Sequence, residues 1–181
     1  MTRMTIALLA AFVLTGVSLA QDKQLPPEGG TPKNFALPDK TSFALDNGLQ
    51  VTLVPFGEVP KVTIRVVVRS GNINEGENTW LADLSGDFLL EGTSSRSADD
   101  IAREAASMGG EVNVSVGEDL TSINGEALSE FAPDMAKLVA DVAMNPAFPE
   151  AELARLKKDR LRQLSVARTQ PQQMATAAFR K

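Results

Sequence analysis

The sequence predicts an α+β fold in which helices pack on one face of an antiparallel or mixed sheet. Asn47-Gly48 separates two strand-like runs, and this dipeptide is a strong signal for a β-hairpin turn. Between residues 61 and 69, Val and Ile alternate with polar residues, which indicates a strand with one buried face. Further along, apolar residues recur at helical spacing. Helices with one apolar stripe can cover one face of a sheet and leave the other to solvent or to a partner.

The same patterns place each element along the chain. They predict a hairpin at 42–55, strands at 61–69, 111–117 and 119–127, helices at 78–90, 98–108, 130–144 and 150–168, and a helical stretch from Pro171. Ser97 is expected to cap the helix at 98–108, and Gly109-Gly110 to end it. The strands at 111–117 and 119–127 are expected to pair through Gly117-Glu118.

Periodicity also predicts which side chains face the core. The inward residues expected on the strand at 61–69 are Val62, Ile64, Val66 and Val68. Those expected on the first three helices are Trp80, Leu81, Leu84, Phe88 and Leu89, then Ile101, Ala105 and Met108, then Phe131, Met135, Leu138, Val139 and Val142. On the helix at 150–168 the inward set is Leu153, Leu156, Leu161 and Leu164, and the outward basic run is Arg155, Lys157, Lys158, Arg160 and Arg162. Such a run is more often a solvated helix face than a binding patch.

The first twenty residues have the features of a secretory signal peptide. Arg3 provides a positive start, a short apolar run follows, and Ser18-Leu19-Ala20 is a small-x-small cleavage site. The alternatives are a membrane anchor and a buried helix, but the apolar run is shorter than the ~20 residues that a membrane span needs. The expected organisation is a signal peptide at 1–20, a flexible Pro- and Gly-rich leader at 21–40, and a domain at 41–181. We therefore expect a periplasmic or otherwise extracytoplasmic protein, without a stable membrane anchor.

The composition excludes several classes of function. The formal net charge is −5, which argues against nucleic acid and anionic lipid as partners. The chain contains neither His nor Cys. Zinc sites rarely lack both residues, a Ser-His-Asp triad needs His, and lipid attachment through Cys is impossible. The composition thus argues against a zinc hydrolase within these residues.

One stretch nevertheless resembles a zinc-peptidase motif. The run Leu81-Ala82-Asp83-Leu84-Ser85-Gly86-Asp87-Phe88-Leu89-Leu90-Glu91-Gly92-Thr93 follows a strand and a Gly-rich turn. It resembles the N-terminal domain of the family that includes pitrilysin, insulinase and mitochondrial processing peptidase. In that family this helix reads roughly Gly-Leu-Ala-His-x-x-Glu-His-hydrophobic and then Gly-Thr. The two His bind zinc, and the Glu activates the metal-bound water.

Aligned with that pattern, this sequence lacks the residues that carry the chemistry. Asp83 and Asp87 fall at the positions of the two His, and Gly86 falls at the position of the catalytic Glu. The third ligand of the family is a Glu on a later helix, and Gln163 occupies the corresponding position. The resemblance therefore implies a degenerate member with no catalytic residues and no metal or other cofactor of its own, although active members bind zinc. Asp83 and Asp87 can be read as solvated carboxylates beside a groove, or as a weak Ca²⁺ or Mg²⁺ site.

The resemblance extends over about residues 42–179 and guides the functional expectation. The sequence stops within a helix, so we expect a C-terminally incomplete piece of a longer protein or a truncated gene product. Family members without the metal motif act as non-catalytic partners of an active subunit. The leading hypothesis is an exported non-catalytic subunit that encloses peptide substrate with a His-x-x-Glu-His homologue or a second domain. The alternatives are a free-standing exported scaffold or binding module, and an active metalloendopeptidase with an altered metal site.

Overall fold

The computed structural model describes residue 30 and residues 36–179. The predicted signal peptide, most of the leader and the last two residues lie outside the described residues. No helix in the described part of the chain is both long enough and apolar enough to cross a membrane. The described chain divides into two compact units, and the boundary in the sequence falls between Phe56 and Gly57.

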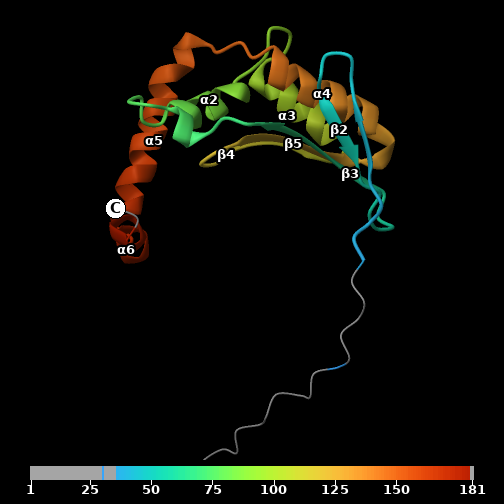
Figure 1. The fold of residues 1–181 in the computed structure, drawn as a ribbon. Coiled ribbons are helices and arrows are strands. Elements are labelled where there is room, and N and C mark those ends of the chain that lie inside the picture. Colours follow the sequence, from blue (N-terminus) through green and yellow to red (C-terminus); the bar gives the residue numbers. More distant parts are fainter. Residues whose placement is uncertain (1–29, 31–35, 180–181) are drawn as a thin grey trace, which may run out of the picture. The chain divides into compact units, whose positions relative to one another are not determined.

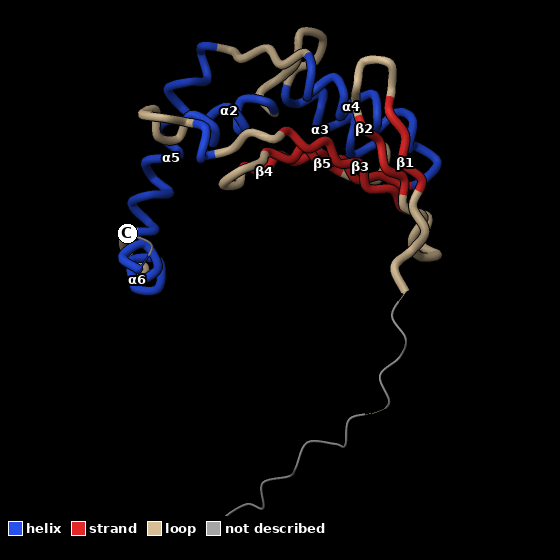
Figure 2. The backbone as a smooth tube through the Cα atoms, in the orientation of Figure 1, coloured by secondary structure: helices blue, strands red, loops and turns tan. Residues whose placement is uncertain are grey.

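The first unit contains the predicted hairpin. Strands β1 (Thr41–Ala44) and β2 (Gln50–Leu53) pair in antiparallel register, with Phe43 opposite Val51 (Figure 2). Gly48 adopts a positive φ of 85°, and the Asn47 side chain accepts a hydrogen bond from the Leu49 amide at 3.1 Å. Asn-Gly therefore forms the turn for the expected reason, because Gly takes up the left-handed conformation without steric cost.

The second unit is built on a three-stranded sheet of β3 (Lys61–Val68), β4 (Glu111–Val116) and β5 (Thr121–Leu128), in the order β3-β5-β4. Both strand pairs are antiparallel, which confirms the predicted α+β class and selects antiparallel over mixed. Val62, Ile64 and Val66 pack against the core as predicted. Val68 was expected to do the same, but it lies at the end of β3 and is 45% exposed.

Helices α2 (Leu81–Leu89), α3 (Ala98–Ser107) and α4 (Ala132–Met144) lie on one face of this sheet (Figure 1). Helix α4 contacts β3 and β5, whereas α2 contacts β4 and α3 contacts both β4 and β5. The core between the layers contains Ile101, Ala105, Met108, Ile123, Ala127, Met135, Leu138, Val139 and Val142. This confirms most of the inward residues predicted for α3 and α4.

Local signals set the helix ends. Ser97 caps α3: its Oγ accepts from the Asp100 amide at 3.2 Å, and the Asp100 carboxylate accepts from the Ser97 amide at 3.2 Å. This reciprocal arrangement is a capping box. Gly109, with φ at 74°, follows the end of α3, and Asn145 follows the end of α4. Short 3₁₀ turns lie at Asn72–Asn74, Ser129–Phe131 and Glu150–Glu152.

The last two helices are α5 (Leu153–Ala167) and α6 (Pro171–Phe179), which extend beyond the sheet (Figure 1). Leu156 is buried, as predicted. Leu161 was expected to face inward, but it is 59% exposed. The expectation failed because helical periodicity reports which residues share a face, not whether another element lies against that face along its whole length.

Candidate functional site

The candidate site lies where α2 meets α5; Phe88 and Leu89 of α2 pack inward as predicted, but Leu81 does not. The buried residues of α2 are Gly86 and Phe88, whereas Leu81 is 51% exposed. Phe88 makes a tilted ring contact with Phe148, at a centroid distance of 5.8 Å. Asp83 and Asp87, one helical turn apart, are partly buried and lie on the side that faces α5.

Glu75 organises the start of α2. The residue before the helix, Trp80, has a left-handed φ of 73° and provides no side-chain cap. The Glu75 carboxylate accepts hydrogen bonds from the backbone N–H groups of Trp80 and Ala82, each at 2.9 Å. Desolvation is the largest single influence on the pKa of Glu75 and acts to raise it, but the hydrogen bonds from backbone N–H groups and from the Asn72 side chain together outweigh it and hold the pKa below its ordinary value. The sequence pattern gave Glu75 no structural role, because two of its partners are backbone N–H groups that lie five and seven residues further along the chain.

Asn72 connects Glu75 to the first carboxylate of the site. Its side-chain amide donates to Glu75 Oε1 at 3.2 Å and to Asp83 Oδ2 at 2.8 Å. One carboxylate oxygen of Asp83 therefore accepts a hydrogen bond from Asn72, which precedes α2 in the chain.

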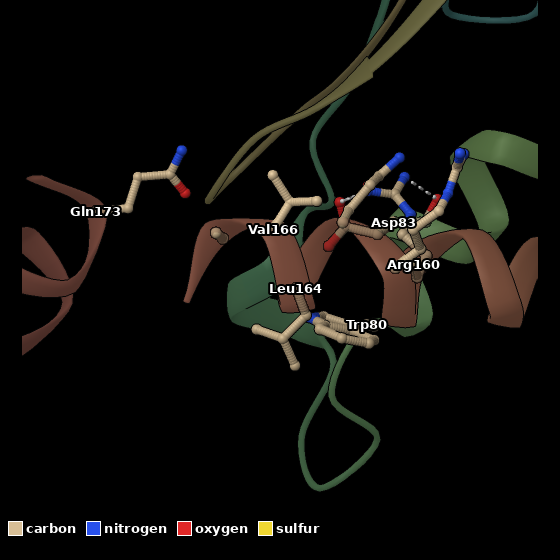
Figure 3. Close-up of a pocket in the computed structure, with 9 residues that line it drawn as sticks. Trp80, Asp83, Arg160, Leu164, Val166 and Gln173 are labelled. Atoms are coloured by element: carbon tan, nitrogen blue, oxygen red, sulfur yellow. Dashed lines mark hydrogen bonds and ion pairs between the residues drawn. The ribbon is translucent and has the colours of Figure 1, made fainter. Parts of the chain in front are cut away.

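Arg160 of α5 binds both carboxylates of α2. Its Nε and Nη2 donate to Asp87 Oδ2 and Oδ1, both at 2.7 Å, and Nη1 lies 3.3 Å from Asp83 Oδ1. Nη2 also donates to the Asp83 carbonyl oxygen at 3.3 Å. Figure 3 shows Arg160 beside Asp83, with dashed lines marking contacts between them. The paired contact with Asp87 is the fork geometry in which guanidinium and carboxylate match best.

This arrangement corrects two expectations. Arg160 was expected on the outward basic face of α5, but its side chain is 22% exposed and turns toward α2. Asp83 and Asp87 were read as solvated carboxylates beside a groove or as a weak Ca²⁺ or Mg²⁺ site; Asp83 does line a hollow, but the two side chains are only 23% and 32% exposed, and their oxygens bind Arg160 and Asn72. The pKa of Arg160 is raised above its ordinary value, mainly by the hydrogen bonds to Asp87 and further by the negative charges of both carboxylates. Desolvation acts in the opposite direction and lowers the pKa.

Gly86, at the position aligned with the catalytic Glu, faces the sheet. A Cβ at residue 86 would lie 2.5 Å from Val116 Cγ2 and 3.4 Å from Val114 Cγ1, both on β4. The absence of a side chain therefore allows α2 to approach β4 closely. On this side of α2, Glu75 and Gly86 help to line a mainly apolar hollow of about 320 Å³.

Gln163, at the position aligned with the third ligand, lies on the α5 side of the site. It lines a hollow of about 490 Å³ together with Asp83, Arg160 and Trp80 (Figure 3). The other lining residues are Arg162, Leu164, Val166, Ala167 and Gln173. The structure thus places Asp83 and Gln163 around one hollow, while Gly86 faces β4.

These residues do not fit a zinc ion. The aligned positions offer two carboxylates already bound to a guanidinium, and an amide, which is a poor zinc ligand. Among the described residues, no group of three or more His, Cys, Asp or Glu side chains is placed to hold a metal. A cation of the chain itself, the guanidinium of Arg160, already lies between the two carboxylates.

Comparison with known proteins shows what this chain is similar to. The model of the family described as Insulinase (Peptidase family M16) matches residues 56–181. An uncharacterized zinc protease of Rickettsia bellii (strain RML369-C) is 29% identical over 137 residues, which cover 75% of this chain and 33% of the relative. The β subunit of the mitochondrial processing peptidase of Rattus norvegicus is 27% identical over 139 residues, which cover 76% of this chain and 28% of the relative. This chain thus spans about a third of the length of these relatives.

Solved structures show the same fold. The inactive M16 peptidase domain from Pseudomonas fluorescens matches with a TM-score of 0.71 at 24% identity, over 78% of this chain and 35% of that one. Pitrilysin matches with a TM-score of 0.65 at 25% identity, over 73% of this chain and 14% of that one. The fold described above therefore corresponds to part of a larger architecture in each of these proteins.

Proposed function

The chain belongs to the insulinase family, peptidase family M16, and from this premise we propose that it is an exported, non-catalytic member that helps to enclose peptide substrate together with an active partner. The observation that carries the proposal is the guanidinium of Arg160, bound between Asp83 and Asp87 at the positions aligned with two zinc ligands. Catalysis in this family needs a metal and a base, whereas enclosing a substrate needs only a surface and an interface.

Three further observations support this proposal. Gly86 stands where the family has its catalytic Glu, and the close approach of Val116 leaves little space for a side chain there. The rat relative is, by its name, one subunit of a processing peptidase, so proteins similar to this chain act within assemblies. The Pseudomonas fluorescens domain with the same fold is described as inactive, so the fold also occurs without activity.

The first test concerns the chain alone. Purified protein is expected to contain no stoichiometric zinc by elemental analysis and to leave an unfolded reporter peptide uncut after zinc is added. About one tightly bound zinc per chain, or zinc-dependent cleavage of the peptide, would instead support an active enzyme with an altered metal site.

The second test concerns the partner. If a neighbouring gene encodes a homologue with the His-x-x-Glu-His motif, the two proteins should co-purify when produced together. The pair should cleave the reporter peptide faster than the homologue does alone, and a homologue whose motif Glu is replaced by Gln is the matched control. A monomer that changes neither the recovery nor the activity of the homologue would favour a free-standing scaffold.

A further inference from the structure

Helix α5 has little apolar contact to hold it in place. Within α5, all of which the structure describes, Leu156 is the only buried residue. Leu161 and Val166, further along the helix, are 59% and 52% exposed. Because the hydrophobic contribution scales with the apolar area that is removed from water, the second half of α5 gains little from burial.

Ion pairs connect α5 to α2 across this sparse contact. Arg155 pairs with Glu91, which lies just after α2 and is 19% exposed, at 2.5 Å; Arg155 itself is 50% exposed and also binds Glu152 and Asp159 near and within its own helix. An ion pair whose cation is half exposed and shared among three carboxylates contributes little. Arg160 differs because it is 22% exposed and directs both of its ion pairs to α2.

The carboxylates also depend on Arg160. Asp83 and Asp87 are four residues apart on one helix, where like charges repel each other. Their side chains are only 23% and 32% exposed, so water screens this repulsion incompletely. A single guanidinium bound to both carboxylates offsets the repulsion and at the same time fixes the distance between the two helices.

We propose that Arg160 takes the structural place of the metal ion in this chain, as the cation that joins α5 to α2. The motif positions explain the substitution: in the family pattern a zinc ion would draw two ligands from the first helix and one from the later helix. Here the same two helices are joined by a cation that belongs to the later one, supplied one turn before Gln163. The inference rests on the placement of the motif and not on the proposed partnership, so it can fail while the partnership stands.

The test is a mutant cycle on the full chain, read by thermal unfolding and by hydrogen exchange of the α5 amides. Arg160→Gln should lower Tm by at least about 4 °C and speed exchange in α5 by at least about tenfold, since it leaves two carboxylates without a counter-charge. The triple variant Asp83→Asn, Asp87→Asn, Arg160→Gln should lose less than the sum of Arg160→Gln and the double Asn variant, because no charge is then left unpaired. Arg160→Lys should lie between the wild type and Arg160→Gln, because Lys keeps the charge and loses the fork.

Arg162→Gln is the matched control. Arg162 lies two residues further along the same helix, is 74% exposed and pairs with Asp159 on α5 itself, so its loss should change neither Tm nor exchange measurably. Additive effects in the cycle would overturn the proposal. So would an Arg160→Gln variant whose α5 amides exchange as slowly as those of Arg162→Gln.

Discussion

Gly86 on α2 and Val116 on β4 are in such close contact that a Cβ at residue 86 would lie 2.5 Å from Val116 Cγ2. Real Cβ atoms essentially never approach that closely, so a side chain at residue 86 requires the Val116 side chain, α2 or β4 to shift. The position aligned with the catalytic Glu has thereby become a packing position.

This contact predicts that Gly86→Ala destabilises the protein, although Ala is the better helix former by about 0.5–1 kcal/mol. Forcing a methyl group into a packed contact costs about 1–3 kcal/mol, so we expect a net loss. Urea unfolding measures the change in the free energy of unfolding.

Val116→Ala should reverse the sign of that effect, because it removes the methyl group that blocks residue 86. In the Val116→Ala background, Gly86→Ala should be neutral or stabilising. Val114→Ala is the control, since it makes the same deletion on β4 at a site 3.4 Å from the new Cβ, and it should relieve little of the loss. Equal relief by both substitutions would contradict the assigned contact.

Asp141 predicts how stability depends on pH. Its carboxylate accepts from Asn145 and Thr93, each at 2.8 Å, and from Arg96 at 2.7 Å, and so ties the loop after α2 to α4. The hydrogen bond from Asn145 leads these influences, which together hold the pKa of Asp141 below its ordinary value of 3.8, although desolvation opposes them. The unfolded chain therefore binds a proton more readily than the folded chain, so stability falls as pH falls below about 4.

Asp141→Asn should lower stability at pH 7 and flatten this acid dependence. Asp134→Asn is the matched control on the same helix, because Asp134 is 59% exposed and pairs only with Lys137 among the interactions that the structure gives it. Thermal unfolding between pH 2.5 and pH 7, on the order of the range where carboxylates titrate, compares the three proteins. If Tm falls with pH as steeply in the Asp141→Asn variant as in the wild type, Asp141 does not contribute to the pH dependence of stability.

The N-terminal sequence predicts that the mature protein begins at Gln21, outside the cytoplasm. Signal peptidases select small residues at the cleavage site, and Ser18-Leu19-Ala20 provides them. N-terminal sequencing of protein recovered from the exported fraction checks this. Ala20→Phe keeps the apolar run but removes the small residue, so uncleaved precursor should accumulate. Exported wild-type protein that still starts at Met1 would refute the prediction.

Local patterns predicted the fold well and the site only in part, for physical reasons. The Asn47-Gly48 turn, the alternation at Val62, Ile64 and Val66, and the Ser97 cap are short-range features, which the sequence displays directly. The pairing of Arg160 with Asp87 spans 73 residues and depends on where a long, flexible side chain settles. Because Arg160 lies within a run of basic residues, periodicity placed it outside, and only the approach of α5 to α2 shows otherwise.

Gly86 illustrates a second limit of the same kind. In the sequence, a Gly within a helix indicates either a less stable helix or a place where another element packs closely against the helix, and the pattern does not say which. The distance to Val116 decides for a close approach. The resemblance alone suggests restoring the family's residues at the four aligned positions. Such a change neglects Arg160, which binds the two carboxylates, and Val116, which lies against residue 86.

The last prediction concerns zinc binding by restored variants. The quadruple variant Asp83→His, Gly86→Glu, Asp87→His, Gln163→Glu recreates the family's ligands, but Arg160 remains between the two helices and Val116 remains against residue 86. A fixed positive charge beside an incoming Zn²⁺ repels it. Removing even ~1.4 kcal/mol of this repulsion would change the zinc affinity tenfold. Adding Arg160→Gln and Val116→Ala should thus raise zinc affinity by at least about tenfold over the quadruple variant, measured by competition with a chelating dye.

The same two substitutions in the wild-type background are the control and should confer no zinc binding, because Asp83, Asp87 and Gln163 remain. If the quadruple and sextuple variants bind zinc equally well, Arg160 does not exclude the metal. If neither binds zinc more tightly than the wild type, the three ligand positions do not converge, and the placement of Gln163 is the first assignment to discard.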